Sequence, residues 1–533
     1  MTELRSVELI FLLLLLFIIW FGQIARKIGT PYPIVMIIGG LLLGFVPWIP
    51  KITFDPDLIF LVVLPPLIYS SAWTTSWRDF RFNIVSILFL AFGLVGFTVV
   101  GVALLTPRLL SGFDWRLGLV LGAIVAPTDA IAATSIARKV GLPSRIVDVL
   151  EGESLINDAT GLLALQFAVA MVVSREIPTV SEGVLTLLWL VIGGVAVGLA
   201  IGWIVCYAER RIDDGPIEIA LSLLVPYGAY FAADAIHASG VLAVVASGLF
   251  LTRRSATMFS PPVRIQIWSF WQSFTFILNG LVFVLIGLQL RTILSMIRDH
   301  GMLDLIRDGA LFSITLIVLR LLWVFPGAHI SHFIRRKFDH QLEPIPPTRQ
   351  IFVVGWTGMR GGVSLAAALA VPAVLDNGNP FPQREFIVFL TFCVILVTLV
   401  LQGLTLPALI RALKLQGSGG PDCEEREARR LVLEAAVAHL EQSQADSGED
   451  VDEAYEDVVG HYRSRLAGLS SSEDEEVSLN HRRFVDLSKE AAKIERETAI
   501  RLRNEGRIND QVLRRLEREL DLTESKYAKA LED

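Results

Sequence analysis

Four ionisable residues lie near the middle of long apolar stretches, where a lipid bilayer opposes charge most strongly. They are Asp129, Glu153, Asp158 and Arg360. A charged side chain at the bilayer centre costs about 2.5–3.5 kcal/mol on insertion scales. Intramembrane charges face the protein interior and mark ion or proton routes, so these four indicate such a pathway.

The composition divides the chain into two regions. Hydrophobic residues make up 53% of the 533 residues, and the mean hydropathy of +0.56 is too high for a soluble protein of this size. Residues 415–533 carry 18 Lys and Arg against 29 Asp and Glu, a net charge of −11, which leaves +4 for residues 1–414. We predict an all-α, polytopic transmembrane domain over 1–414, a flexible linker over 415–421 and an acidic helical tail over 422–533.

Thirteen apolar runs in the first region are of helical length. About 20 residues span the hydrocarbon core at 1.5 Å per residue. The runs lie at residues 7–25, 32–47, 58–73, 84–106, 117–137, 148–173, 184–207, 217–234, 240–252, 268–290, 308–328, 350–372 and 386–410. The count depends on a break at His237–Gly240, which separates the eighth run from the ninth.

The loop charges predict how these helices are oriented. When alternate loops are assigned to one side, the side that begins with Arg26 and Lys27 collects 18 Lys and Arg, and the other side collects nine. The positive-inside rule places the richer side in the cytoplasm. We therefore expect a multi-pass protein of the inner or plasma membrane, with its N-terminus outside and its tail in the cytoplasm.

Two of the runs contain helix breakers beside their charges. Pro127 precedes Asp129 in the fifth run, and residues 355–362 of the twelfth run contain four glycines around Arg360. With one linker helix between two sets of six, the fifth and twelfth runs occupy equivalent places. This pattern predicts two inverted six-helix repeats whose broken helices cross at a site near the bilayer midplane.

The helical rise places the charges at one depth. Asp158 and Arg360 each lie about 15 Å from the predicted cytoplasmic face, and Asp129 lies about 13 Å from it. Asp129 is a candidate both for a helix cap and for an ion ligand. Glu153 and Arg360 are candidates for a buried strut. Asp158 has no obvious cationic partner left, which favours transport.

Five segments of the transmembrane domain are considered together as motifs. They are Leu64–Ile68, Gly152–Ala159, Ala233–Ala243, Phe283–Leu288 and Gly358–Gly362. Together, and in this order, they resemble the signatures of sodium/proton antiporters of the cation:proton antiporter superfamily, in the electroneutral branch related to the animal exchangers. The resemblance covers most of residues 1–414 and implies a thirteen-helix fold, a homodimer, and a core domain that moves against a dimerisation domain.

The resemblance also implies roles for individual residues. Asp158 resembles the carboxylate that binds cation and proton, with Asn157 beside it. The other residues that resemble site-forming positions are Thr128, Asp129 and Ser154. Glu153 and Arg360 resemble the structural ion pair. Ser70 stands where many relatives carry an acid, so the ligand set here is less charged.

A single carboxylate that binds either a cation or a proton predicts exchange of one for the other. Oxygen ligands suit a hard cation, so we expect Na+ to bind the Asp158 carboxylate, the Ser154 hydroxyl, a carbonyl near Thr128 and water. Asn157 takes the place of a second acid, which predicts 1:1, electroneutral exchange. We expect a secondary transporter that exchanges Na+ or Li+ for H+ by alternating access and serves pH homeostasis.

Other functions stay open from the residues alone. A K+/H+ antiporter is the main alternative, because nothing here separates Na+, Li+ and K+. A cation channel would need a continuous polar pore. An intramembrane hydrolase would need a recognisable catalytic group, and His329 and His332 lack a suitable acid. We expect no enzyme activity, no cofactor and no nucleic-acid partner.

The tail is predicted to be helical. Asn509 is a candidate cap for a last helix, whose Leu513, Leu516 and Leu520 form a narrow apolar stripe. Two interpretations are open: a solvated helical bundle, or a regulatory module in which His439, His461 and His481 titrate near neutral pH.

Overall fold

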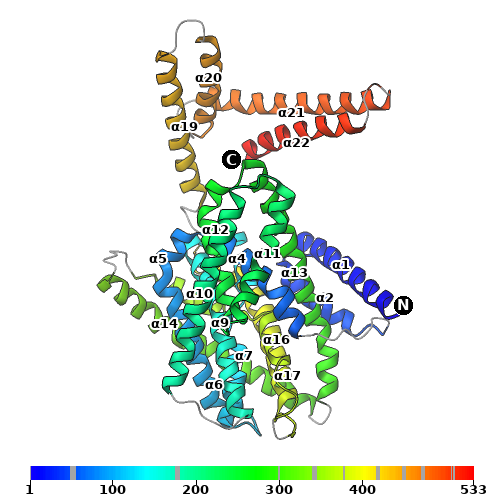
Figure 1. The fold of residues 1–533 in the computed structure, drawn as a ribbon, viewed down its shortest axis with the longest axis vertical. Coiled ribbons are helices and arrows are strands. Elements are labelled where there is room, and N and C mark those ends of the chain that lie inside the picture. The colour runs from blue at the N-terminus through cyan, green and yellow to red at the C-terminus, as the bar shows by residue number, and fades with distance from the viewer. Residues whose placement is uncertain are drawn as a thin grey trace. The chain divides into compact units, whose positions relative to one another are not determined.

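The computed structural model describes most of the chain as two compact helical units. The described residues are 2–47, 56–173, 180–297, 301–338, 345–375, 378–415, 421–446, 452–469, 475–505, 507 and 510–532. The units are Met1–Gly417 and Ser418–Asp533 (Figure 1). Within these ranges every regular element is a helix, apart from one isolated bridge between Val374 and Pro380. Most of the predicted linker, residues 416–420, lies outside the described residues.

The first unit is built from apolar helices. Their bounds, in chain order, are α1 (Thr2–Ile28), α2 (Tyr32–Gly44), α3 (Pro56–Leu58), the π-helical η1 (Ile59–Val63), α4 (Leu64–Thr74), α5 (Trp77–Leu88), the π-helical η2 (Phe89–Leu94), α6 (Val95–Leu109), α7 (Trp115–Val125), α8 (Ala130–Val140), α9 (Ser144–Val173), α10 (Val180–Glu209), α11 (Gly215–Asp234), α12 (Gly240–Met258), α13 (Pro261–Met296), α14 (Met302–Phe338), α15 (Thr348–Trp356), α16 (Gly362–Leu369), α17 (Arg384–Val397), the π-helical η3 (Thr398–Gln402) and α18 (Gly403–Ala412).

The described helices confirm a polytopic membrane protein. Nine of them are long and apolar enough to cross a bilayer, and the bent pair α7 and α8 makes a tenth. The shorter α2 is also apolar. Each of the thirteen predicted runs coincides with a helix or with a broken helix, but the number of thirteen crossings and the inverted repeat stay predictions.

Local sequence signals set several helix ends. Asp114 begins α7, because its Oδ1 accepts a hydrogen bond from Leu117 N at 2.9 Å. Ser239 begins α12 in the same way, through Leu242 N at 3.2 Å. Gly141 ends α8 at a φ of 76°, the left-handed conformation that favours glycine. The predicted break at His237–Gly240 is confirmed, because α11 ends at Asp234 and α12 begins at Gly240.

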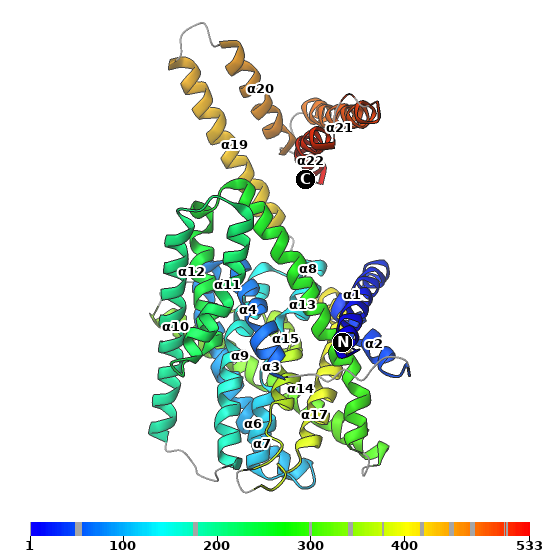
Figure 2. The same cartoon turned by 45° about the vertical axis from the view of Figure 1, so that its right-hand side comes forward.

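Helix packing places α9 at the centre of the unit. This helix contacts α5, α7, α8 and α12. The helices α10, α11 and α12 pack together, and α6 packs along α7 (Figure 2). Helix α2 packs tightly on α13, where a Cβ on Gly287 would clash with the Ile37 carbonyl. Contact this close anchors α13, which forms one wall of the site described below.

The described residues of the second unit form four helices. They are α19 (Pro421–Asp446), α20 (Asp452–Leu469), α21 (Glu475–Asn504) and α22 (Asp510–Glu532). The last two pack on each other, with Leu513 and Leu520 buried and Arg496 paired with Asp521 at 2.6 Å. The helical prediction for the tail is confirmed. The predicted cap Asn509 lies outside the described residues.

Candidate functional site

Two helix breaks meet in the middle of the first unit. The chain is interrupted between α7 and α8, whose axes differ by 43°, and between α15 and α16. Asp129 N of the first break donates to Met359 O of the second at 2.8 Å. Arg360 Nε donates to Val125 O, at the end of α7, at 3.0 Å. The predicted breakers thus interrupt both helices, and the two interruptions hold each other.

Two glycines allow this close approach. A Cβ on Gly361 would overlap the Asp129 carboxylate, and a Cβ on Gly358 would overlap the Arg320 side chain. Both positions therefore require a residue without a side chain. The glycine-rich segment serves as a close-packed contact surface for two ionic side chains as well as a break in the helix.

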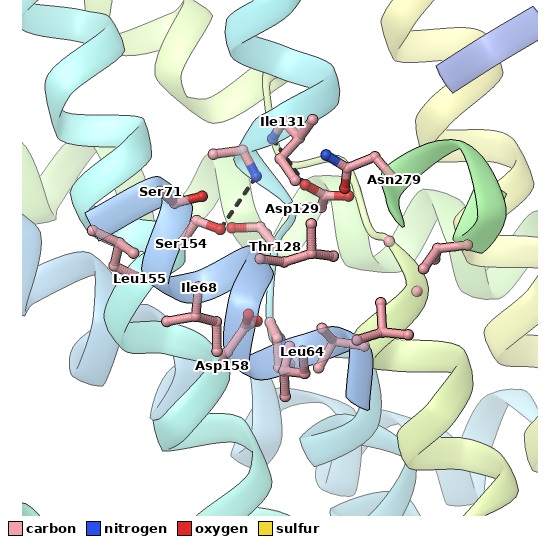
Figure 3. Close-up of a pocket in the computed structure, with 18 of the residues that line it drawn as sticks. Leu64, Ile68, Ser71, Thr128, Asp129, Ile131, Ser154, Leu155, Asp158 and Asn279 are labelled. Atoms are coloured by element: carbon pink, nitrogen blue, oxygen red, sulfur yellow. Dashed lines mark hydrogen bonds between the residues drawn. The ribbon is translucent and has the colours of Figure 1, made fainter. Parts of the chain in front are cut away.

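A cavity of about 120 Å³ lies beside the crossing (Figure 3). Four of the five predicted ion-site residues line it, and they are Thr128, Asp129, Ser154 and Asp158. The fifth, Asn157, does not line the cavity. It is buried behind it, where its Nδ2 donates to Thr128 Oγ1 at 2.8 Å.

Asp129 is both a helix cap and a cavity residue. Its Oδ1 accepts from Ile131 N at 2.8 Å, so the carboxylate begins α8. Ser154 supports the same turn, because its Oγ accepts from Ala130 N at 3.3 Å. The cap lies at the positive end of the α8 dipole, which stabilises a negative carboxylate there. The two roles that the sequence left open for Asp129 are thus compatible.

Asp158 differs from Asp129 in its surroundings. Among the hydrogen bonds and ion pairs found in the described part of the chain, none involves the Asp158 carboxylate. Its neighbours in Figure 3 include Leu64 and Ile68 of α4. A half-buried carboxylate with an apolar neighbour and no fixed partner is available to an exchangeable ion.

The structure corrects the predicted buried ion pair. Glu153 pairs with Arg320 of α14 rather than with Arg360, through Arg320 Nη1 to Oε1 at 2.6 Å and Nη2 to Oε2 at 2.9 Å. Both side chains are 1% exposed. This two-point geometry is the strongest that arginine makes with a carboxylate.

Arg360 has a different set of partners. Its guanidinium donates to the carbonyls of Val125 and Gly358, and its backbone N donates to Thr398 Oγ1 at 3.1 Å. Val125 is the last residue of α7, so the partial negative charge of that helix end lies next to the arginine. Backbone carbonyls take the place of the predicted carboxylate partner.

A buried chain of hydrogen bonds links the ion pair to the cavity wall. Thr128 Oγ1 donates to Glu153 Oε1 at 3.0 Å and accepts from Asn157 Nδ2. The Thr128 hydroxyl is therefore engaged with the Glu153–Arg320 pair. Asn157 fixes the break at Thr128 from behind, while Ser154 and Asp158 of the same helix face the cavity.

Two residues of this region had no role in the sequence prediction. Arg320 is an arginine within an apolar run, which is the signal that identified Arg360, but nothing in the sequence places α14 beside Glu153. Asn279 of α13 lines the cavity and interrupts the apolar run 268–290. Its carboxamide in the middle of that run was the available signal.

Comparison with known proteins gives consistent matches. The family described as "Sodium/hydrogen exchanger, transmembrane" matches residues 11–412. An uncharacterized Na+/H+ exchanger of Escherichia coli K12 is 31% identical over 93% of this chain and 94% of its own length. A sodium, potassium, lithium and rubidium/H+ antiporter of Bacillus pumilus is 31% identical over 82% of this chain and 66% of its own length.

A solved structure shares the fold. The sodium proton antiporter MjNhaP1 from Methanocaldococcus jannaschii, at pH 8, superimposes with a TM-score of 0.60 at 20% identity. The match covers 78% of this chain and all of that one. At this identity the likeness concerns the arrangement of helices alone.

Proposed function

The chain belongs to the sodium/hydrogen exchanger family, and from that premise we propose that it exchanges Na+ for H+ across a membrane with Asp158 as the group that holds either ion. The observation that carries the proposal is the half-buried Asp158 carboxylate, which has no fixed partner and lines the cavity at the crossing of two broken helices. Asp129, Ser154 and the backbone near Thr128 would complete the oxygen ligands.

Two cavities meet α9 on opposite sides of Asp158, which supports alternating access. The first extends from Asp158 past Ser154 to Glu151 and to Thr74 at the end of α4. These ends of the helices lie on the side that the loop charges assign to the cytoplasm. The second cavity, of about 100 Å³, is lined by Ala159 and Thr160 of α9 and by Asp234.

We infer that the two cavities are half-routes to the two sides of the membrane. Asp158 then belongs to whichever route is open. A carboxylate that exchanges one monovalent ion for one proton moves no net charge per cycle, so we propose 1:1, electroneutral exchange. K+ is the alternative substrate that a cation series must address.

Competition between the two ions is the direct test. We expect the apparent KM for Na+ to rise as pH falls, by up to about tenfold per pH unit where the site is mostly protonated, because proton and cation bind one carboxylate in a mutually exclusive way. The measurement is dissipation of a pH gradient in proteoliposomes, titrated with Na+, Li+ and K+ at several pH values. Protein-free liposomes give the leak.

The outcomes of this test are distinct. A KM for Na+ that stays constant while the maximal rate falls with pH would exclude a shared site. Saturation by K+ with no response to Na+ would replace the substrate. An imposed membrane potential that drives exchange would exclude 1:1 stoichiometry.

We further propose that the tail regulates transport without taking part in it. The tail forms its own compact unit, in which Val485, Ala492 and Ala499 of α21 are buried. A chain that ends at Gly420 should therefore keep exchange activity but shift the pH of half-maximal activity by about half a unit or more. Identical pH profiles for the two chains would leave the tail without this role.

A further inference from the structure

A buried asparagine forms part of the cavity wall opposite α8 and α9. Asn279 lies in the middle of α13, is 3% exposed and lines the same cavity as Asp129 and Asp158. Figure 3 shows its side chain beside Asp129. A buried carboxamide is costly unless its polar atoms are paired, so its presence in an apolar helix calls for a reason.

The nitrogen of the carboxamide is not satisfied by the described part of the protein. Asn279 Nδ2 is buried, and no hydrogen-bond partner for it lies within the described ranges. The Tyr32 hydroxyl of α2 lies near the carboxamide but does not meet hydrogen-bond geometry at Nδ2. A buried donor without a partner destabilises the folded state, because it has lost its hydrogen bond to water. Unmet groups in native structures are few and mark strain, catalysis, or the place of a water or an ion.

The position of Asn279 completes the set of oxygen ligands. Thr128 and Asp129 come from the break between α7 and α8, and Ser154 and Asp158 come from α9. All four approach the cavity from two adjoining elements. The rest of the wall carries hydroxyl groups from α4 and α16, and Asn279 is the lining residue of α13 that has a side-chain oxygen.

We propose that Asn279 is a ligand of the transported cation, through its carbonyl oxygen, and that it sets which cation the site prefers. The inference rests on the proposed function of Asp158. A half-turn of the carboxamide exchanges its oxygen and nitrogen, so one side chain can offer the oxygen to a cation or the N–H group to the Asp129 carboxylate. The carboxamide stays free to turn because its Nδ2 makes no hydrogen bond within the described residues.

A neutral oxygen ligand affects small cations most. Na+ and Li+ give up more hydration energy than K+, so they depend more on the number and strength of the oxygen dipoles around them. Loss of the Asn279 oxygen should therefore weaken Na+ and Li+ binding and shift the preference toward K+. A purely structural asparagine would change stability and rate but not the order of cations.

The test compares variants at this position in proteoliposomes. Asn279→Leu, similar in size but apolar, should raise the apparent KM for Na+ by about fivefold or more, while the maximal rate at saturating cation changes by less than about twofold. Asn279→Asp, which keeps an oxygen at the same place, should restore the KM. The ratio of Li+, Na+ and K+ values is measured for each variant.

A buried asparagine outside the cavity provides the matched control. Asn83 of α5 is 2% exposed and also has an amide atom without a partner, its Oδ1, but it does not line this cavity. Asn83→Leu should leave the KM for each cation and their order unchanged. If Asn279→Leu does not fold, Asn279→Ala is judged by the same criteria.

Each negative result would refute a different part of the proposal. Values of KM and cation order within about twofold of the unmodified chain in Asn279→Leu or Asn279→Ala would refute the role of Asn279 alone. Full exchange by Asp158→Asn, or no exchange by the unmodified chain, would refute the proposed function itself. An equal rise in KM for all three cations would refute the part of the proposal that concerns selectivity.

Discussion

Asp158→Asn is expected to abolish exchange, with a loss of about 100-fold or more, because the neutral amide neither binds a proton nor balances the charge of a cation. The substitution keeps the size of the side chain. It also removes no hydrogen bond, because the carboxylate has none within the described residues. The loss should therefore appear in transport and not in folding. Gradient dissipation in proteoliposomes measures the first, and thermal unfolding in detergent measures the second.

Asp148→Asn is the matched control for this variant. Asp148 lies on the same helix, ten residues earlier, and lines neither of the two cavities along α9. Its amide variant should retain exchange within about threefold of the unmodified chain. Equal losses in both variants would indicate a general effect of charge on α9. Normal exchange by Asp158→Asn would move the ion site to Asp129, the acid that lines the cavity at the crossing of the two helix breaks.

Features that follow from local rules were predictable from the sequence. Pro127 and the glycines around Arg360 break helices through backbone chemistry that needs no tertiary partner. The helical rise also predicts the depth of Asp129 and Asp158 in the membrane, because that depth depends on counting residues along one helix. The comparison of the two breaks predicted a crossing, and the hydrogen bond from Asp129 N to Met359 O joins them.

Features that depend on which helices are neighbours were not predictable. Spacing along α9 shows that Glu153 and Asp158 face different directions, but it does not reveal which arginine faces Glu153. Two arginines lie inside apolar runs, and the sequence prediction chose Arg360. In the structure Glu153 pairs with Arg320, because α14 packs beside α15. Gly358, which has no side chain, leaves room there for the side chain of Arg320.

The same limit applies to Asn279. A polar residue inside an apolar run is a weak signal, since buried amides also serve packing. Its meaning comes from α13 lying against the cavity, which is set by the tight contact of α13 with α2. Which helices are neighbours is known only from the contacts between them, and counting residues along one helix does not reveal it.

Arg320→Gln is expected to destabilise the protein by about 3–5 kcal/mol, because it leaves the Glu153 carboxylate buried without its partner. Both side chains are 1% exposed, so water cannot replace the lost interaction. The measurement is the apparent unfolding temperature of the purified protein, which should fall by several degrees. The double variant Glu153→Gln with Arg320→Gln should be less damaged than the single one, since no buried charge is left over.

A second ion pair in the same unit controls for the loss of an arginine as such. Arg138 and Glu151 also meet at 2.6 Å, but the Arg138 side chain is 61% exposed. Arg138→Gln should therefore cost only about 0–1 kcal/mol. Two pairs with equal contact distances and unequal burial separate the effect of desolvation from that of charge pairing.

A double-mutant cycle decides which arginine is the partner of Glu153. The coupling energy between Glu153→Gln and Arg320→Gln should be large, and that between Glu153→Gln and Arg360→Gln should be small, because Arg360 is held by the carbonyls of Val125 and Gly358. The opposite order would restore the pair expected from the sequence. It would also require α14 to lie elsewhere. The hydrogen bonds that join Glu153 through Thr128 to the cavity wall would then have to differ as well.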